Sequence, residues 1–225
     1  MTQPPSAALP ALVFDFDGTL IESAPEIRRC LNMLLDEYGR PPVTLAAVER
    51  MIGNGVAKLV ERGFRATGGP PDDFDTALRQ FVRLYNEAPI DETPVYEGVP
   101  ETLARLHAAG HVMAICTNKL YEPTVKILEG LDLMRYFRVV AGGDTFPVRK
   151  PDPGHLLGVL KQLGVNQDAA VMIGDSPNDI GCAIDAGVRS IAVSYGYSRV
   201  PPAELGANLL IDRFADLPDA LARLG

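Results

Sequence analysis

Residues 11–20 read ALVFDFDGTL, and this stretch decides the fold. Four apolar residues come first, and Asp15, Asp17 and the turn-forming Gly18 follow them, which is typical of a buried strand that ends at a polar loop. Four later segments repeat this design, each with an apolar run ahead of a polar or glycine-containing loop. They are residues 112–116, 139–141, 169–173 and 191–193.

Helical patterns alternate with these strands, because apolar side chains recur there at a spacing of three to four residues. The last pattern follows Ser176, a good N-cap, and has a proline at its first position. The expected helices span residues 100–109, 121–131, 153–163 and 177–186. This alternation predicts a Rossmann-like α/β core, in which helices cover both faces of a parallel sheet.

Residues 22–92 break the alternation, because they contain helical patterns and no convincing strand. Ser23 and Glu26 have the spacing of a capping box ahead of a first helix. Three further helices are expected, with starts at Thr44, at Gly55 and at Asp72 or Asp73. We therefore expect a small all-helical cap domain, inserted directly after the first strand.

This insertion divides the chain into three parts. We expect a disordered leader at residues 1–10, an α/β core formed by residues 11–21 and 93–225, and a helical cap at residues 22–92. The first ten residues lack the basic start and the long apolar run of a signal peptide.

The composition is that of a folded protein, with 47% apolar and 22% charged residues among 225. The net charge of −8 argues against binding to nucleic acids or anionic membranes, and it means that an anionic substrate would need a local cation.

No segment approaches the roughly 20 apolar residues of a membrane helix. The three cysteines are odd in number and far apart, so we expect no disulfide framework and a cytoplasmic protein, either monomer or homodimer.

Polar side chains follow the predicted strands, where ligands bind in open α/β sheets. Carboxylates that converge at one rim repel one another unless a cation lies among them, and hard oxygen ligands suit Mg²⁺. A lysine and a hydroxyl beside them suit a phosphate. The candidate residues are Asp15, Asp17, Thr117, Asn118, Lys150, Asp175 and Asp179. Taken singly, each could be a turn, capping or surface residue, and it is their joint order that indicates metal-assisted phosphoryl chemistry.

Four motifs in this set resemble those of the haloacid dehalogenase superfamily. They are DFDGTL at residues 15–20, Thr117, Lys150 in KPDP, and GDSxxD at residues 174–179. The resemblance implies that Asp15 attacks phosphorus and forms an aspartyl-phosphate, while Asp17 protonates the leaving oxygen and then activates water.

The same resemblance assigns the remaining positions. Thr117, Asn118 and Gly18 would contact the phosphate, and Lys150 would neutralise charge on the nucleophile and the phosphoryl group. Mg²⁺ would be bound by the Asp15 and Asp175 carboxylates and the Asp17 main-chain carbonyl, with Asp179 as support behind them.

The helical insert resembles the cap of the phosphoglycolate phosphatase-like branch, which would exclude water and recognise the leaving group. The resemblance lies in residues 19–25, 52–55, 59–62, 116–119 and 194–197. In the cap, a turn and two cations are candidates for substrate recognition, although the turn could equally be a plain interhelical one. They are Gly53, Asn54 and Gly55 for the turn, and Lys58 and Arg62 for the cations.

These observations predict a Mg²⁺-dependent phosphatase for a small phosphate monoester, with 2-phosphoglycolate as the best candidate. The alternatives are the same chemistry on a nucleotide, a sugar phosphate or pyrophosphate, a phosphomutase, and a non-catalytic regulatory protein. Asp17 counts against a dehalogenase, which lacks this second acid, and Val56 stands where a mutase would carry an arginine.

Overall fold

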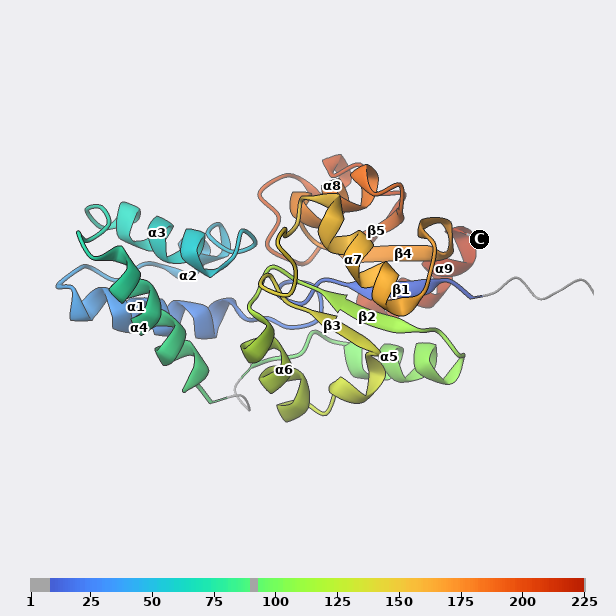
Figure 1. The fold of residues 1–225 in the computed structure, drawn as a ribbon, viewed down its shortest axis with the longest axis horizontal. Coiled ribbons are helices and arrows are strands. Elements are labelled where there is room, and N and C mark those ends of the chain that lie inside the picture. Colours follow the sequence, from blue (N-terminus) through green and yellow to red (C-terminus); the bar gives the residue numbers. More distant parts are fainter. Residues whose placement is uncertain (1–8, 90–92, 225) are drawn as a thin grey trace, which may run out of the picture.

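We analysed a computed structural model that describes residues 9–89 and 93–224. Within these residues, the core is built on one sheet of six parallel strands in the order β3-β2-β1-β4-β5-β6 (Figure 1). The strands are β1 (Ala11–Phe14), β2 (Met113–Cys116), β3 (Val139–Ala141), β4 (Ala170–Gly174), β5 (Arg189–Val193) and β6 (Leu209–Ile211). The strand order reverses on either side of β1, and this reversal opens a crevice at the carboxyl ends of the strands.

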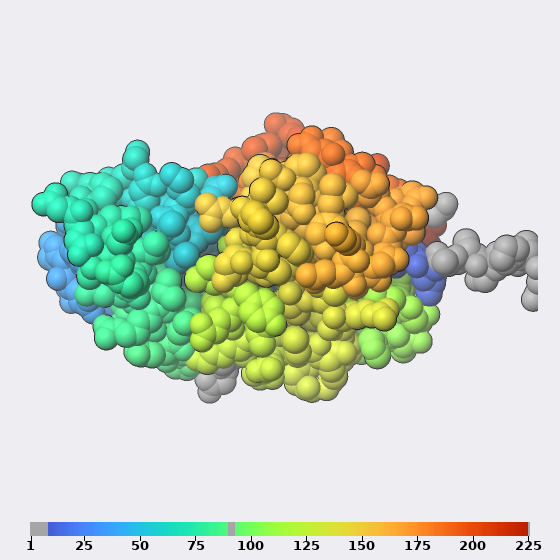
Figure 2. Space-filling model, in the orientation of Figure 1, coloured from blue at the N-terminus to red at the C-terminus, as the bar shows by residue number. Residues whose placement is uncertain are grey.

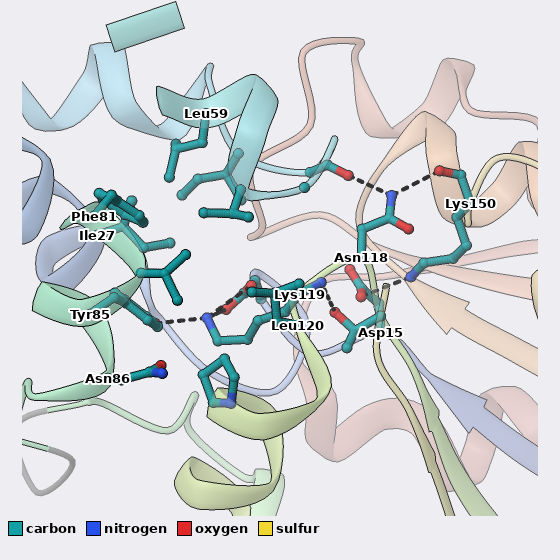
Figure 3. Close-up of a pocket in the computed structure, with 18 of the residues that line it drawn as sticks. Asp15, Ile27, Leu59, Phe81, Tyr85, Asn86, Asn118, Lys119, Leu120 and Lys150 are labelled. Atoms are coloured by element: carbon teal, nitrogen blue, oxygen red, sulfur yellow. Dashed lines mark hydrogen bonds and ion pairs between the residues drawn. The ribbon is translucent and has the colours of Figure 1, made fainter. Parts of the chain in front are cut away.

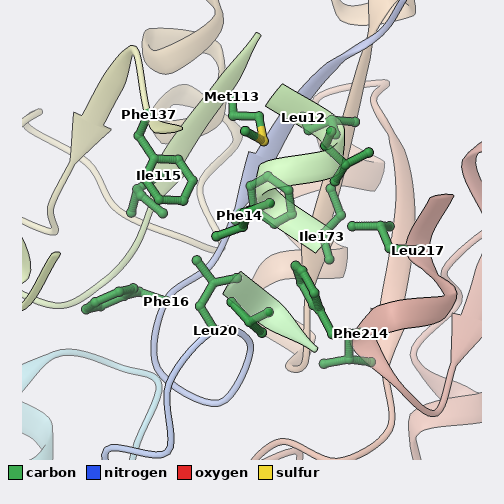
Figure 4. Close-up of a cluster of buried hydrophobic side chains, with 14 of the residues drawn as sticks. Leu12, Phe14, Phe16, Leu20, Met113, Ile115, Phe137, Ile173, Phe214 and Leu217 are labelled. Atoms are coloured by element: carbon green, nitrogen blue, oxygen red, sulfur yellow. The ribbon is translucent and has the colours of Figure 1, made fainter. Parts of the chain in front are cut away.

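Side chains of β1 alternate between the two faces of the sheet, as a strand requires. Leu12 and Phe14 pack into a cluster with Phe214 (Figure 4). Val13 packs into a second cluster with Met172. Helices cover both clusters: α5 (Val99–Ala108), α6 (Tyr121–Gly130) and α9 (Leu217–Leu224) cover one, and α7 (Pro153–Leu163) and α8 (Pro177–Asp185) cover the other. The predicted α/β core is confirmed.

The described part of the insert, residues 22–89, contains helices and no strand. Its helices are α1 (Ala24–Glu37), α2 (Leu45–Glu49), α3 (Val56–Ala66) and α4 (Phe74–Asn86). They share a hydrophobic cluster around Leu34, Phe64 and Phe81 that includes no residue of the sheet. Figure 2 shows this helical unit, coloured from blue to teal, packed against one end of the core.

Most of the expected elements are present, with differences at their ends. Thr44 Oγ1 accepts from Ala47 N and Asp73 Oδ1 accepts from Thr76 N, so both side chains cap helices as predicted. Strand β6 and helix α9 were not predicted. Four 3₁₀ turns also lie in the described residues, at Met134–Tyr136, Gln167–Ala169, Pro202–Glu204 and Phe214–Asp216.

The capping box expected at the start of α1 is wrong. The Ser23 backbone is already helical, with φ −84° and ψ −11°, and its hydroxyl makes no capping hydrogen bond. The Glu26 carboxylate instead forms an ion pair with Arg29 at 2.6 Å. Ser23 Oγ is buried and has no hydrogen-bond partner in the structure.

The expected leader of residues 1–10 lies largely outside the described residues. No helix found in the described residues is both long enough and apolar enough to cross a membrane.

Candidate active site

The carboxyl ends of the strands bring four predicted residues together, facing the helical insert. Asp15 follows β1, Thr117 follows β2 and Asp175 follows β4, while Lys150 comes from the loop ahead of α7. All four side chains are buried. Lys150 Nζ lies 2.8 Å from Asp15 Oδ1 and 2.5 Å from Asp179 Oδ1, so one ammonium joins two carboxylates.

Asp15, Asp175 and Asp179 form a carboxylate cluster, with one oxygen from each within 4.8 Å of the others. Burial raises the pKa of Asp15 to about 7, and the charge of Asp179 adds to this rise while Lys150 opposes it. Burial and the charges of Asp179 and Asp15 also raise the pKa of Asp175 well above its ordinary value. Three carboxylates thus share one lysine, and their hard oxygen donors fit a divalent cation such as Mg²⁺.

Asp179 is held in place by the start of α8. Its Oδ2 accepts from Ser176 N at 2.9 Å and from Ser176 Oγ at 2.6 Å, while its Oδ1 accepts from Lys150. Ser176 thus serves as the N-cap that the sequence indicated. Because both Asp179 oxygens are occupied by protein donors, the carboxylate is suited to position Lys150 rather than to react.

Asp175 is fixed from two sides by the chain. Its Oδ2 accepts from Tyr197 N at 2.6 Å, and its Oδ1 accepts from Thr19 Oγ1 at 3.2 Å. Gly18 has φ +87°, and a Cβ at this position would lie 2.7 Å from Asp175 Oδ2. A glycine is therefore required here by both its backbone conformation and its close approach to the carboxylate.

Asp17 contacts Lys119, which in turn contacts Tyr85, and neither of these two residues was among the predicted site residues. Lys119 Nζ lies 3.0 Å from Asp17 Oδ1 and 3.3 Å from Oδ2, and it also donates to the Tyr85 hydroxyl at 2.7 Å. Removal from water raises the pKa of Tyr85 to about 12, although Lys119 opposes this. Burial would lower the pKa of Lys119, but Asp17 and Tyr85 outweigh it and the pKa is raised.

A cavity of about 70 Å³ lies between the helical insert and the core (Figure 3). Its floor is polar and includes Asp15, Asp17, Thr117, Lys119 and Lys150. The wall from the insert is mostly apolar, and it consists of Ile27, Ile52, Val56, Leu59, Phe81 and Val82 together with Gly53, Gly55, Tyr85 and Asn86. The cavity thus joins a charged reaction centre to a wall with little polar surface.

The turn at residues 53–55 is hydrogen-bonded to the core. Gly53 O accepts from Asn118 Nδ2 at 2.8 Å and from Asn178 Nδ2 at 2.9 Å, while Asn54 Nδ2 lies 3.4 Å from Asn178 Oδ1. Arg199 Nη2 donates to Ile52 O at 2.9 Å. These bonds hold the turn against the rim of the sheet.

Comparison with known proteins agrees with this geometry. A family model described as haloacid dehalogenase-like hydrolase matches residues 12–193. The chain belongs to this family.

Several relatives and solved structures resemble it closely. A phosphoglycolate phosphatase from Rhodospirillum rubrum is 44% identical, and the match covers 94% of this chain and 90% of that protein. A phosphoglycolate phosphatase from Agrobacterium fabrum is 40% identical, with 94% and 92% covered. The crystal structure of a predicted phosphoglycolate phosphatase from Haemophilus somnus has a TM-score of 0.90 at 30% identity, with 94% and 97% covered.

In this haloacid dehalogenase-like hydrolase, three of the five expected recognition residues do not line the cavity. Lys58 Nζ pairs with Glu61 at 2.7 Å, and 55% of its side chain is exposed. Arg62 donates to Met51 O and to Asn54 Oδ1, each at 2.8 Å, so it stabilises the turn. Asn54 bonds to Arg62 and to Asn178 of the core. Substrate contacts of Lys58, Arg62 and Asn54 stay a prediction.

Asn118, expected at the phosphate, has a bridging side chain. Its Nδ2 donates to Gly53 O and to Lys150 O, each at 2.8 Å, so both amide hydrogens are engaged. A contact of Asn118 with phosphate would therefore use its backbone N–H, and Thr117 and Gly18 stay predicted phosphate ligands.

Proposed function

We propose that this hydrolase is a Mg²⁺-dependent phosphatase that cleaves a small phosphate monoester, with 2-phosphoglycolate as substrate and glycolate and phosphate as products. The observation that carries the proposal is the Asp15–Lys150 pair at 2.8 Å, which faces a cavity that Asp17 also lines. The names of the relatives from Rhodospirillum rubrum and Agrobacterium fabrum support the choice of substrate.

Asp15 is the proposed nucleophile. Its carboxylate oxygen forms a bond to phosphorus as the bond from phosphorus to the substrate's leaving oxygen breaks, and Asp17 gives that oxygen its proton. Water then attacks phosphorus and the bond to Asp15 breaks, while Asp17 takes the proton from the water. Lys150 reduces the repulsion between Asp15 and the anionic phosphoryl group.

Asp15, Asp175 and the Asp17 main-chain carbonyl are the proposed Mg²⁺ ligands, with Asp179 as support. The bound ion would supply positive charge that stabilises the phosphoryl oxygens and allows Asp15 to ionise at neutral pH. The raised pKa values of Asp15 and Asp175 support this assignment, because burial and the neighbouring carboxylates disfavour the two charged forms and a cation would favour them.

Residues 22–92 are the proposed cap, and the rest of the chain after the leader is the proposed catalytic core. An apolar wall over the reaction centre would exclude water during the first step. The hydrogen bonds from Asn118 and Asn178 to Gly53 O support a closed position of this cap. The free, buried Cys30, Cys116 and Cys182 support a reducing compartment, for which we propose the cytoplasm.

Phosphate release from a panel of esters tests the proposal. The panel contains 2-phosphoglycolate, ethyl phosphate, a nucleoside monophosphate, a hexose phosphate and pyrophosphate, each with Mg²⁺ and with EDTA. We expect the highest kcat/KM for 2-phosphoglycolate, dependence on Mg²⁺ and loss of activity in Asp15→Asn. Activity that survives in Asp15→Asn would overturn the mechanism, whereas faster cleavage of another ester would overturn only the substrate.

Lys161→Met is a matched control, because Lys161 is exposed on α7 and should leave activity unchanged.

A further inference from the structure

Lys119 places a positive charge at the middle of the cavity. Figure 3 shows its side chain extending from the core floor toward Tyr85 on α4. Only 7% of the side chain is exposed. Its ammonium group carries three N–H donors and contacts Asp17 Oδ1 at 3.0 Å, Asp17 Oδ2 at 3.3 Å and the Tyr85 hydroxyl at 2.7 Å. Giving up the longer of the two Asp17 contacts frees one donor for a further acceptor while the ion pair is kept.

The other lysine that lines the cavity is committed elsewhere. Lys150 contacts Asp15 at 2.8 Å and Asp179 at 2.5 Å, and its role is at the reacting phosphate. Among the described residues that line the cavity, Lys119 is therefore the one cation left for any second anionic group on the substrate.

The apolar wall makes such a cation necessary. A carboxylate enclosed by Ile27, Val56 and Leu59 would lose its hydration, and a buried charge is tolerated when it is paired and hydrogen-bonded. The Tyr85 hydroxyl adds a second donor, because it accepts from Lys119 and keeps its own proton. Lys119 and Tyr85 thus present an ammonium and a phenol side by side, which suits the two oxygens of a carboxylate.

We propose that Lys119, together with the Tyr85 hydroxyl, binds a carboxylate that the substrate carries beside its phosphate, and thereby selects phosphorylated small acids. This inference rests on the proposed phosphatase function and adds the residues that would determine its specificity. A merely structural Lys119, which neutralised Asp17 and did nothing else, would affect all phosphate esters alike.

A ratio of two substrates separates these roles. Ethyl phosphate has the shape of 2-phosphoglycolate with a methyl group in place of the carboxylate. We define the selectivity as kcat/KM for 2-phosphoglycolate divided by kcat/KM for ethyl phosphate, measured with saturating Mg²⁺. Any general damage to the reaction centre cancels in this ratio.

We expect Lys119→Met to lower the selectivity by about 100-fold, mostly through a higher KM for 2-phosphoglycolate, because a buried ion pair loses one partner. Lys119→Arg keeps the charge and should keep most of the selectivity. Tyr85→Phe, which leaves the Lys119–Asp17 pair intact, should lower the selectivity by about 10-fold. Lys161→Met serves again as the exposed-lysine control.

An unchanged selectivity in Lys119→Met would overturn the inference. If Lys119→Met does not fold, an unchanged selectivity in Tyr85→Phe overturns it instead. A wild-type protein that is active but prefers ethyl phosphate would also overturn it. Failure of the proposed function is a different result, because the wild-type protein would then release phosphate from neither ester.

Discussion

Replacing Asp15 by asparagine should stabilise the metal-free protein at pH 8, although it removes the proposed nucleophile. Burial and the neighbouring Asp179 raise the pKa of Asp15 from 3.8 to about 7, and the ion pair with Lys150 at 2.8 Å offsets only part of this effect. Asparagine keeps the shape of the side chain without its charge. The substitution therefore removes a charge that the folded protein tolerates poorly.

The sign and size of the effect follow from the raised pKa of Asp15. Between pH 3.8 and about 7, the folded state holds a proton on Asp15 that the unfolded chain has released. The free energy of unfolding therefore falls as the pH rises through this range. Each pKa unit corresponds to about 1.4 kcal/mol, so ionisation of Asp15 costs the folded state up to about 4 kcal/mol. Asp15→Asn does not lose this free energy of unfolding, because asparagine has no carboxyl group to ionise.

Urea unfolding followed by circular dichroism, at pH 5 to 8 in EDTA, measures the effect. From pH 5 to 8, which covers about two of the three pKa units, we expect the difference in free energy of unfolding, Asp15→Asn minus wild type, to increase by about 2 to 3 kcal/mol. Asp36→Asn, an exposed change on α1, is the matched control. Mg²⁺ should restore much of the wild-type stability at pH 8 and have a smaller effect on Asp15→Asn. A difference that stays constant from pH 5 to 8 would refute the reasoning.

Three further substitutions test other parts of the structure. Asn178→Ala removes the 2.9 Å hydrogen bond to Gly53 O, which is worth about 1 kcal/mol. KM should therefore rise about five-fold in steady-state assays, and an unchanged KM would contradict the proposed cap contact. Ser23→Ala removes a buried hydroxyl without a partner and should raise the free energy of unfolding by about 1 kcal/mol, whereas a loss of stability in urea would count against this. Gly18→Ala places a methyl group 2.7 Å from Asp175 Oδ2 at a backbone φ of +87°. It should lower the free energy of unfolding by about 2 kcal/mol or more and abolish phosphate release. Retained activity would disprove the need for glycine.

The core of the fold could be predicted because the central strands β1, β2 and β4 are buried on both faces and are followed by polar loops. The strand β1 and the helix α7 have the predicted bounds, since a continuous apolar run and a proline after a capping residue are strong local signals. Strand β6 has three residues, and the middle one, Leu210, is 38% exposed, so its sequence lacks the pattern of a buried strand. Helix α9 has eight residues, which is a short stretch for a periodicity argument.

The reaction centre could be predicted for the same reason that the sheet could. Parallel strands place their carboxyl ends at one edge, so Asp15, Thr117 and Asp175 must come together once the strand order is established. The contact between Tyr85 and Lys119 has no such origin. It joins residues 34 positions apart, and it depends on how α4 lies against the core. The Tyr85 ring packs against the hydrophobic cluster of the insert, as expected for an apolar position of α4. Its hydroxyl extends past this cluster to Lys119.

Lys58 and Arg62, two predicted recognition residues, do not line the cavity. Their charge made them candidates for substrate binding, but a cation on a short helical insert can satisfy its donors locally before it reaches a cavity. Glu61 lies three residues from Lys58, within the reach of a helical ion pair, and Arg62 finds carbonyl and amide oxygens in the adjacent turn. Charge alone therefore does not identify a substrate contact, because a nearby acceptor can bind the cation instead.

The balance of charge in the cavity connects these observations. Asp15, Asp17 and Asp179 line it together with only two lysines, and Asp175 lies beside them. Each lysine already contacts at least one carboxylate, so the two together cannot balance the charge of these acids and of a phosphate dianion as well. Because an apolar wall from the insert lines one side of the cavity, solvent screens the repulsion between these acids and an incoming phosphate less than it would at an open surface. Substrate binding in such a site requires added positive charge, and this requirement, rather than the net charge of the whole chain, is the strongest physical reason to expect a divalent cation here.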